Sequence, residues 1–146
     1  MRELPRQLTA DELTELFEGR TRFVERLALE ENPLAHARTL VHELSPEEKK
    51  EVLDAHPQIG RRTGLSAQSA AEQGAEADPD VLVELDRMNA EYEARHGFRF
   101  VVFVNRRPKA VILDVLRARI DNPTDEERET ALDELVAIAE DRWCSR

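Results

Sequence analysis

The chain has 146 residues, the length of one ordinary domain, and we expect a single domain over residues 1–146. Charged residues make up 36% of the chain and aromatic residues only 5%, a balance that favours an all-α fold over a β-sandwich. The formal net charge of -10 argues against nucleic acid or an anionic membrane as a partner, because both bind basic surfaces.

The sequence gives no indication of export or membrane insertion. The opening stretch MRELPRQLTADE has no apolar core of the kind that a secretion signal needs. The longest purely apolar run, residues 100–104, is far too short to span a bilayer. Cys144 is the one cysteine, so no intramolecular disulfide can form and a reducing compartment is permitted. We therefore expect a cytoplasmic protein.

Five places in the chain carry residues that begin helices. In the first type, a hydroxyl residue stands three positions before a glutamate, so that the two side chains can satisfy each other's free backbone amides in a capping box. These hydroxyl residues are Thr9, Ser45 and Thr124. In the second type, a side-chain cap precedes a proline at the first helical position, as at Asn32 and Asp78.

Two further stretches add to the predicted helices. Residues 21–31 place Phe23, Val24 and Leu27 on one face, and Pro108 can open another helix. Gly97 is a stop signal for the helix that begins after Asp78. The sequence therefore predicts a compact bundle of seven or eight helices.

Residues 98–104 interrupt the helical pattern. They are rich in aromatic and β-branched side chains and alternate in part, as a buried extended segment does. A lone strand would have no partner here. We therefore expect one short extended connector that crosses the core between two helices and whose backbone amides find other partners.

The segment AHPQIGRR, residues 55–62, contains the first candidate for chemistry. The residue before a proline is disfavoured in the α region, so His56 should lie at or just past the end of the helix begun at Ser45. Local reasoning leaves two interpretations open. His56 either marks an ordinary helix end or transfers a proton.

Other polar residues also have both a structural and a functional interpretation. Ser69, Glu72 and Gln73 share one face of a predicted short helix, which is either a solvated face or the polar wall of a pocket. Arg119 and Arg142 each continue an apolar stripe. Such an arginine either extends to solvent past the apolar surface or binds an anion at the edge of a site.

No motif in the sequence predicts a metal or a nucleotide cofactor. His36 and His42 are six residues apart, about 240° around a helix, and so do not share a face. The sequence contains no HExxH, cysteine cluster, P-loop, GxGxxG or GxSxG. We expect a protein without a bound metal.

Several motifs occur together in the order found in one known enzyme family. They are the His-Pro of residues 56–57, the Ser-x-x-Glu-Gln of residues 69–73, the Asn-x-x-Tyr of residues 89–92, the Gly-Phe-x-Phe of residues 97–100 and a closing IAEDRW. With them, nearly the whole chain resembles the 2-oxo-4-hydroxy-4-carboxy-5-ureidoimidazoline (OHCU) decarboxylases, which catalyse the last of the three steps from urate to (S)-allantoin. The resemblance implies an all-helical carboxy-lyase that is commonly a homodimer and needs no cofactor.

The resemblance also implies roles for individual residues. His56 matches the family's catalytic histidine, and Glu72 is the second catalytic candidate, either orienting His56 or accepting from the substrate hydroxyl. Pro57, Glu72 and Arg142 fall on stretches that contact the small anionic ureidoimidazoline substrate. The other residues on such stretches are Ser69, Gln73, Phe100, Val101, Val102, Phe103 and Val104.

Three departures from the family pattern concern the loops. The connection from His56 to Ser69 is several residues shorter than in typical members, and Gln58 replaces the usual aspartate. Arg106-Arg107-Pro108 stands where many members have Gly-Arg-Ser. These departures leave two alternatives open: a helical interaction module without the activity, or an enzyme that acts on a different ureido acid or related heterocycle.

Overall fold

The computed structural model describes residues 4–5, 7–59 and 78–145 of the chain. This part of the chain forms seven helices and no strand, which confirms the predicted all-α class. The helices are α1 (Ala10–Phe17), α2 (Arg22–Leu27), α3 (Pro33–His42), α4 (Pro46–Asp54), α6 (Pro79–His96), α7 (Lys109–Arg119) and α8 (Thr124–Cys144). None of the described helices is long and apolar enough to cross a membrane.

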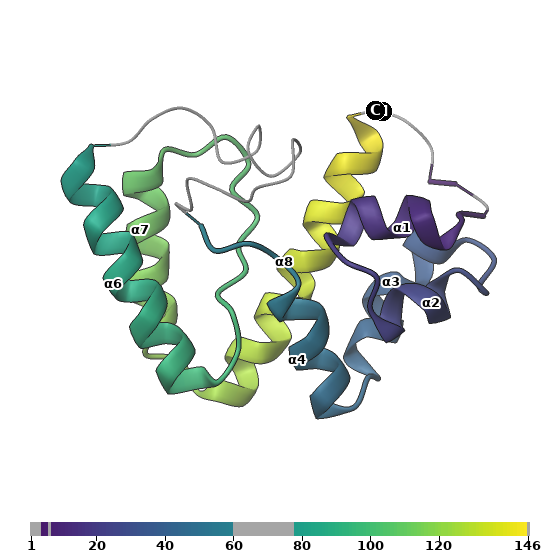
Figure 1. The fold of residues 1–146 in the computed structure, drawn as a ribbon, viewed down its shortest axis with the longest axis horizontal. Coiled ribbons are helices and arrows are strands. Elements are labelled where there is room, and N and C mark those ends of the chain that lie inside the picture. Colours follow the sequence, from purple (N-terminus) through teal and green to yellow (C-terminus); the bar gives the residue numbers. More distant parts are fainter. Residues whose placement is uncertain (1–3, 6, 60–77, 146) are drawn as a thin grey trace.

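The longest helix, α8, runs between two groups of helices (Figure 1). On one side it packs against α1, α3 and α4, and on the other against α6, while α2 packs on α1 and α7 on α6. The buried residues of α8, which include Leu132, Leu135 and Val136, spread over about half of its circumference. Such a face is wider than the apolar stripe of a helix packed on one side only, which suits a central helix.

The local helix-start signals behave largely as predicted. Thr9 and Ser45 form capping boxes, in which each hydroxyl accepts from the amide of the glutamate three residues later. Asp78 caps α6 by accepting from Asp80 N at 2.8 Å. Asn32 precedes α3 with a left-handed backbone (φ 54°) and makes no side-chain cap, so its proline alone marks that start.

The capping box predicted at Thr124 is wrong. Helix α8 begins at Thr124 itself, and the hydroxyl of Thr124 lies 2.8 Å from His96 Nδ1. Glu127 turns into the core, where it is fully buried and its Oε1 accepts from Tyr92 Oη at 2.6 Å and from Arg119 Nε at 2.6 Å. A buried guanidinium without an anion costs several kcal/mol, more than a missing helix cap, so the carboxylate pairs in the core.

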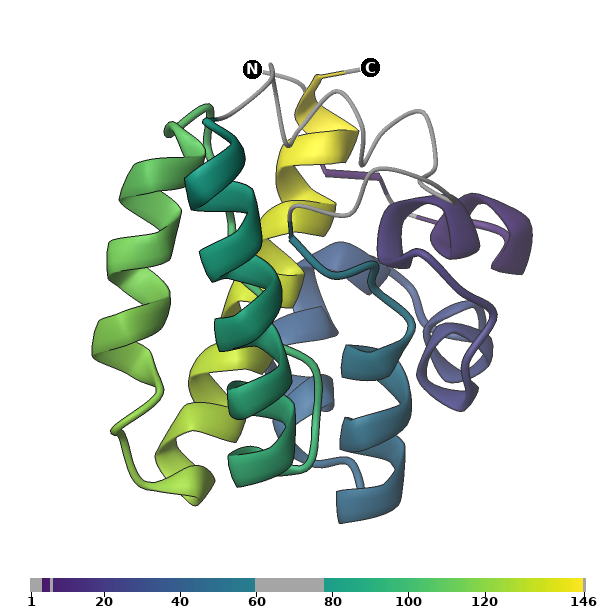
Figure 2. The same ribbon diagram turned by 60° about the vertical axis from the view of Figure 1, so that its left-hand side comes forward.

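Residues 98–104 form the predicted extended connector. Helix α6 ends at Gly97 (φ 78°), and the connector then runs back along it, so that α6 and α7 lie parallel (Figure 2). Arg119 supports the connector from α7: its Nη1 donates to Val101 O at 2.8 Å, and its guanidinium carbon lies 4.7 Å from the centre of the Phe100 ring. Side-chain contacts thus support a buried extended segment that belongs to no sheet.

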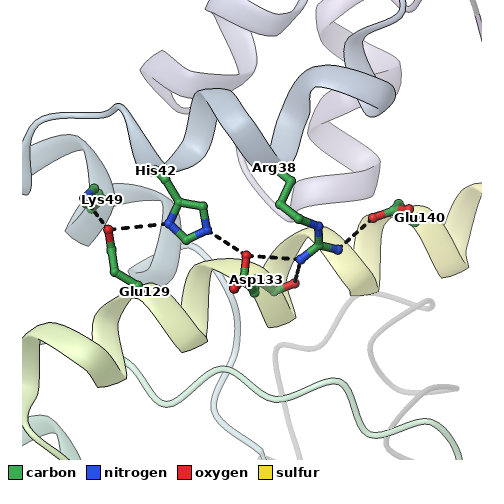
Figure 3. A network of polar contacts seen from close by, with 6 residues as sticks. All are labelled: Arg38, His42, Lys49, Glu129, Asp133 and Glu140. Atoms are coloured by element: carbon green, nitrogen blue, oxygen red, sulfur yellow. Dashed lines mark hydrogen bonds and ion pairs between the residues drawn. The ribbon is translucent and has the colours of Figure 1, made fainter.

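A chain of polar contacts joins α3 and α4 to the outer face of α8 (Figure 3). His42 Nε2 lies 2.6 Å from Asp133 Oδ1, and Arg38 bridges Asp133 and Glu140. Lys49 of α4 also belongs to this chain of contacts, because its Nζ lies 2.8 Å from Glu129 Oε1 of α8. These side chains are largely half-exposed, so each pair adds at most about 1 kcal/mol and the apolar contacts beneath them hold the helices together.

The contacts of Glu127 predict a large effect of a small substitution. Glu127→Gln should lower the free energy of unfolding by about 3–5 kcal/mol, because it leaves the buried Arg119 without its anion. Glu126 is exposed, and Glu126→Gln is the matched control, with an expected change within about 0.5 kcal/mol. Urea unfolding followed by circular dichroism measures both values. Equal midpoints for the two variants would contradict this role of Glu127.

Candidate active site

His56 lies just past the end of α4, as its position before Pro57 predicts. The helix ends at Asp54, and His56 N still donates to Leu53 O at 3.2 Å. The side chain is buried with 5% exposure, and neither ring nitrogen has a hydrogen-bond partner in the described part of the chain. Buried polar atoms are nearly always paired, so two unpaired nitrogens on one ring mark this position as a candidate site.

The surroundings of His56 keep its imidazole neutral. Burial is the largest cause, and together with nearby charges it lowers the pKa of His56 from 6.5 to about 4. The positive charge of Arg142 acts in the same direction, as does the weaker effect of Arg99, whereas the carboxylate of Glu18 opposes them. At neutral pH the ring can therefore accept a proton at one nitrogen and donate a hydrogen bond from the other.

Arg142 reaches this site from the last turn of α8. Its guanidinium is buried, so the interpretation that it extends to solvent is wrong. Its Nη1 donates to Glu15 O at 3.1 Å and to Leu16 O at 3.2 Å, and its Nη2 donates to Glu18 Oε1 at 2.9 Å. The carbonyls at the end of α1 have no partners within their own helix, which is why a cation is stabilised there.

Glu18 is a member of this site that the sequence analysis missed. It ends α1 in the left-handed conformation (φ 65°), and its side chain is 11% exposed. A non-glycine residue rarely takes this conformation without support, which the ion pair with Arg142 supplies here. A side-chain carbon added at Gly19 would lie 3.0 Å from Ala55 Cβ, so this turn packs against the residue directly before His56. Gly19 is the one sequence signal of that close approach.

The residues that follow His56 are anchored to α6. Gln58 Nε2 donates to Glu93 Oε2 at 2.7 Å, and Asn89 Nδ2 donates to Ile59 O at 3.0 Å. Pro57, directly before Gln58, is half-buried. Asn89 is 1% exposed, and within the described residues its Oδ1 has no partner. The start of the loop thus has a fixed backbone course.

The remaining candidates fall into two groups. Ser69, Glu72 and Gln73 lie outside the described residues. In the connector, Phe100, Val101, Val102 and Val104 are buried and Phe103 is half-buried. The connector meets the end of α4 at its first residues and α8 further along, where Phe103 N donates to Glu134 Oε1 at 3.4 Å. No cluster of three His, Cys, Asp or Glu side chains suited to a metal ion occurs among the residues that the structure describes.

The lowered pKa of His56 predicts a loss of stability in acid. Between pH 6.5 and about 4 the unfolded chain binds a proton at His56 that the folded protein does not, so the stability present above pH 6.5 falls as the pH approaches 4. The loss from this group is on the order of 3 kcal/mol. His56→Asn should lack it, whereas a variant of the exposed His36, His36→Asn, should lose stability as the wild type does. Urea unfolding at several pH values checks this, and parallel curves for all three proteins would contradict it.

Curated proteins with similar sequences share one name. A 2-oxo-4-hydroxy-4-carboxy-5-ureidoimidazoline decarboxylase of Haloferax volcanii is 37% identical over 111 residues, covering 73% of this chain and 66% of the relative. A protein of the same name from Halalkalicoccus jeotgali is 32% identical over 103 residues, with coverages of 68% and 58%. The aligned part of the chain thus spans less than two thirds of either relative.

Solved structures share the arrangement of helices. A crystal structure of an OHCU decarboxylase in the presence of (S)-allantoin superposes with a TM-score of 0.74 at 24% identity, over 90% of this chain and 94% of the other. A crystal structure of an (S)-allantoin synthase gives a TM-score of 0.68 at 23% identity, over 93% of this chain and 48% of the other. These likenesses confirm the fold. Because residues 2–143 also match the sequence profile of the OHCU decarboxylases, the chain belongs to the OHCU decarboxylase family.

Proposed function

We propose that the protein catalyses the cofactor-independent decarboxylation of OHCU to (S)-allantoin, the last step of urate degradation to allantoin, as a cytoplasmic homodimer. Membership of the family and the name that the curated relatives share support this proposal. The observation that carries it is the buried, neutral imidazole of His56, which lies near the charge of Arg142 and has no hydrogen-bond partner in the described part of the chain.

The chemistry of the substrate calls for a group of this kind. Loss of carbon dioxide leaves an electron pair on carbon, which the neighbouring imine delocalises. The resulting enol-like anion then loses its hydroxyl proton, gains a proton on one face of the adjacent carbon and takes up a second proton from water at the imine nitrogen, so that one proton is consumed overall. A neutral His56 can take the hydroxyl proton and return it to carbon, with a gain on the order of 10²–10⁴-fold that is typical of general acid–base catalysis.

Arg142 supplies positive charge for an anionic substrate within a chain of net charge -10. Both of its Nη atoms already hold groups at the end of α1, so its position is fixed before the substrate arrives. A fixed charge in a site screened from water stabilises a bound carboxylate without the cost of reorganisation. We assign Arg142 to the binding of the substrate anion.

The other assignments extend this site beyond His56 and Arg142. Glu72 orients His56 or accepts from the substrate hydroxyl, while Ser69 and Gln73 match the donors and acceptors of the ureido and ring amide groups. Pro57 holds the backbone at the end of α4. The connector, residues 98–104, provides an apolar wall and amide donors to the ring carbonyls, and such a wall favours the loss of charge as neutral carbon dioxide.

The proposed reaction is tested with OHCU made enzymatically from urate. Circular dichroism should show faster formation of (S)-allantoin with the protein than without it. His56→Asn should slow this reaction by about 10²-fold or more at unchanged helicity, because it removes the proton-transferring group. His36→Asn, at an exposed position, is the control and should keep the wild-type rate. Decay to racemic allantoin at the uncatalysed rate would refute the proposal and favour an interaction module.

A further inference from the structure

Arg99, at the start of the connector, clamps the end of α4. Its Nη1 donates to His56 O at 2.7 Å and to Asp54 O at 3.3 Å. Its backbone amide donates to Asp54 Oδ1 at 2.9 Å. Carbonyls at the end of a helix lack partners within the helix. Arg99 supplies a hydrogen-bond donor to two of them, Asp54 O and His56 O, which lie on either side of Ala55. The guanidinium thus fixes the backbone directly before and at His56.

Glu93 on α6 orients this guanidinium. Its Oε1 accepts from Arg99 Nε at 3.1 Å, and its Oε2 accepts from Gln58 Nε2 at 2.7 Å. The side chains of Arg99 and Glu93 are 25% and 31% exposed, so water screens their attraction less than that of an open surface pair. Through this carboxylate, Arg99 and Gln58 hold the backbone on both sides of Pro57.

We propose that Arg99 is a positioning residue for His56, an inference that rests on the proposed decarboxylation. Whichever group contacts the ring, the direction of the imidazole depends on the position of its backbone, which Arg99 holds through His56 O. Most catalytic histidines are oriented by a hydrogen bond to the second ring nitrogen. A clamp on the backbone adds to such an orientation, and a displacement near 1 Å can cost about 10²-fold in rate.

Arg99 also contributes to the charge around the ring. The groups that act on the imidazole come from three elements: Arg142 from α8, Glu18 from the end of α1 and Arg99 from the connector. Arg142 and Arg99 disfavour the imidazolium form, whereas Glu18 favours it. A variant that keeps the charge of Arg99 and one that removes it should therefore differ in the pKa of His56.

Two variants separate the clamp from the charge. Arg99→Lys keeps the charge but loses the planar fork, so kcat should fall by about 10- to 100-fold with KM changed less than about 3-fold, and the pKa of His56 should stay near 4. Arg99→Gln loses both, so kcat should fall at least as far. In that variant the pKa of His56, followed by NMR of the ring, should rise above 4 and remain below 6.5, because burial persists.

Further variants keep the test decisive. Arg95→Gln, which changes an exposed arginine of α6 that lies 3.6 Å from Asp121, should leave kcat and the His56 titration unchanged. Glu93→Gln retains the arginine but loosens its orientation, so it should lower kcat even if Arg99→Gln fails to fold.

The proposal is overturned if folded Arg99→Lys and Glu93→Gln keep the wild-type kcat, or if Arg99→Gln leaves the pKa of His56 at about 4. A loss of thermal stability alone would identify Arg99 as a structural residue and would also overturn it. The ring titration needs no substrate. An inactive wild-type protein would therefore refute the proposed reaction and with it the positioning role, while the titration would still show whether the charge of Arg99 acts on the ring.

Discussion

Two buried charges on α8 determine how the other helices dock. Glu127 near its start is fully buried, and Arg142 near its end is 6% exposed. An unpaired ion in the interior costs several kcal/mol, so each must be met by a specific partner from elsewhere in the chain. Arg119 of α7 and Tyr92 of α6 donate hydrogen bonds to Glu127. Arg142 donates to a backbone carbonyl in the last turn of α1. The two groups of helices that α8 separates are therefore placed by polar contacts as well as by apolar packing.

The docking of α1 also creates the electrostatic environment of the site. The contact that satisfies Arg142 brings Glu18 and Gly19 against the end of α4, beside His56. The histidine thus lies near a cation and an anion that are already paired with each other, and it forms no ion pair of its own among the described residues. Its low pKa follows mainly from its burial, which leaves the imidazole neutral at neutral pH.

Features that depend on neighbouring residues could be predicted from the sequence, and features that depend on remote partners could not. Ser45 and the end of α4 before His56 follow from local rules of capping and proline geometry. The same capping rule gave a wrong prediction for Glu127, because this side chain bonds instead to Tyr92, which is 35 residues away in the sequence. The stripe on α8 pointed Arg142 inward, but its partners include backbone carbonyls, which leave no trace in the sequence. Glu18 was missed for the same reason: only the fold brings it to the site.

The charge balance around His56 gives a reason why a ring with a pKa of about 4 can serve the proposed reaction. Such a group is a weak base at neutral pH in the free protein. The negative charge of the substrate, first on the carboxylate and after decarboxylation on the delocalised anion, would offset the charges of Arg142 and Arg99 and raise the pKa of His56, which favours transfer of the hydroxyl proton to the ring. Once a proton from water has neutralised the imine nitrogen, the pKa falls again and the ring releases its proton to carbon. A permanently high pKa would favour only the first transfer, and a permanently low one only the second, so fixed cations next to the ring suit a reaction that needs both.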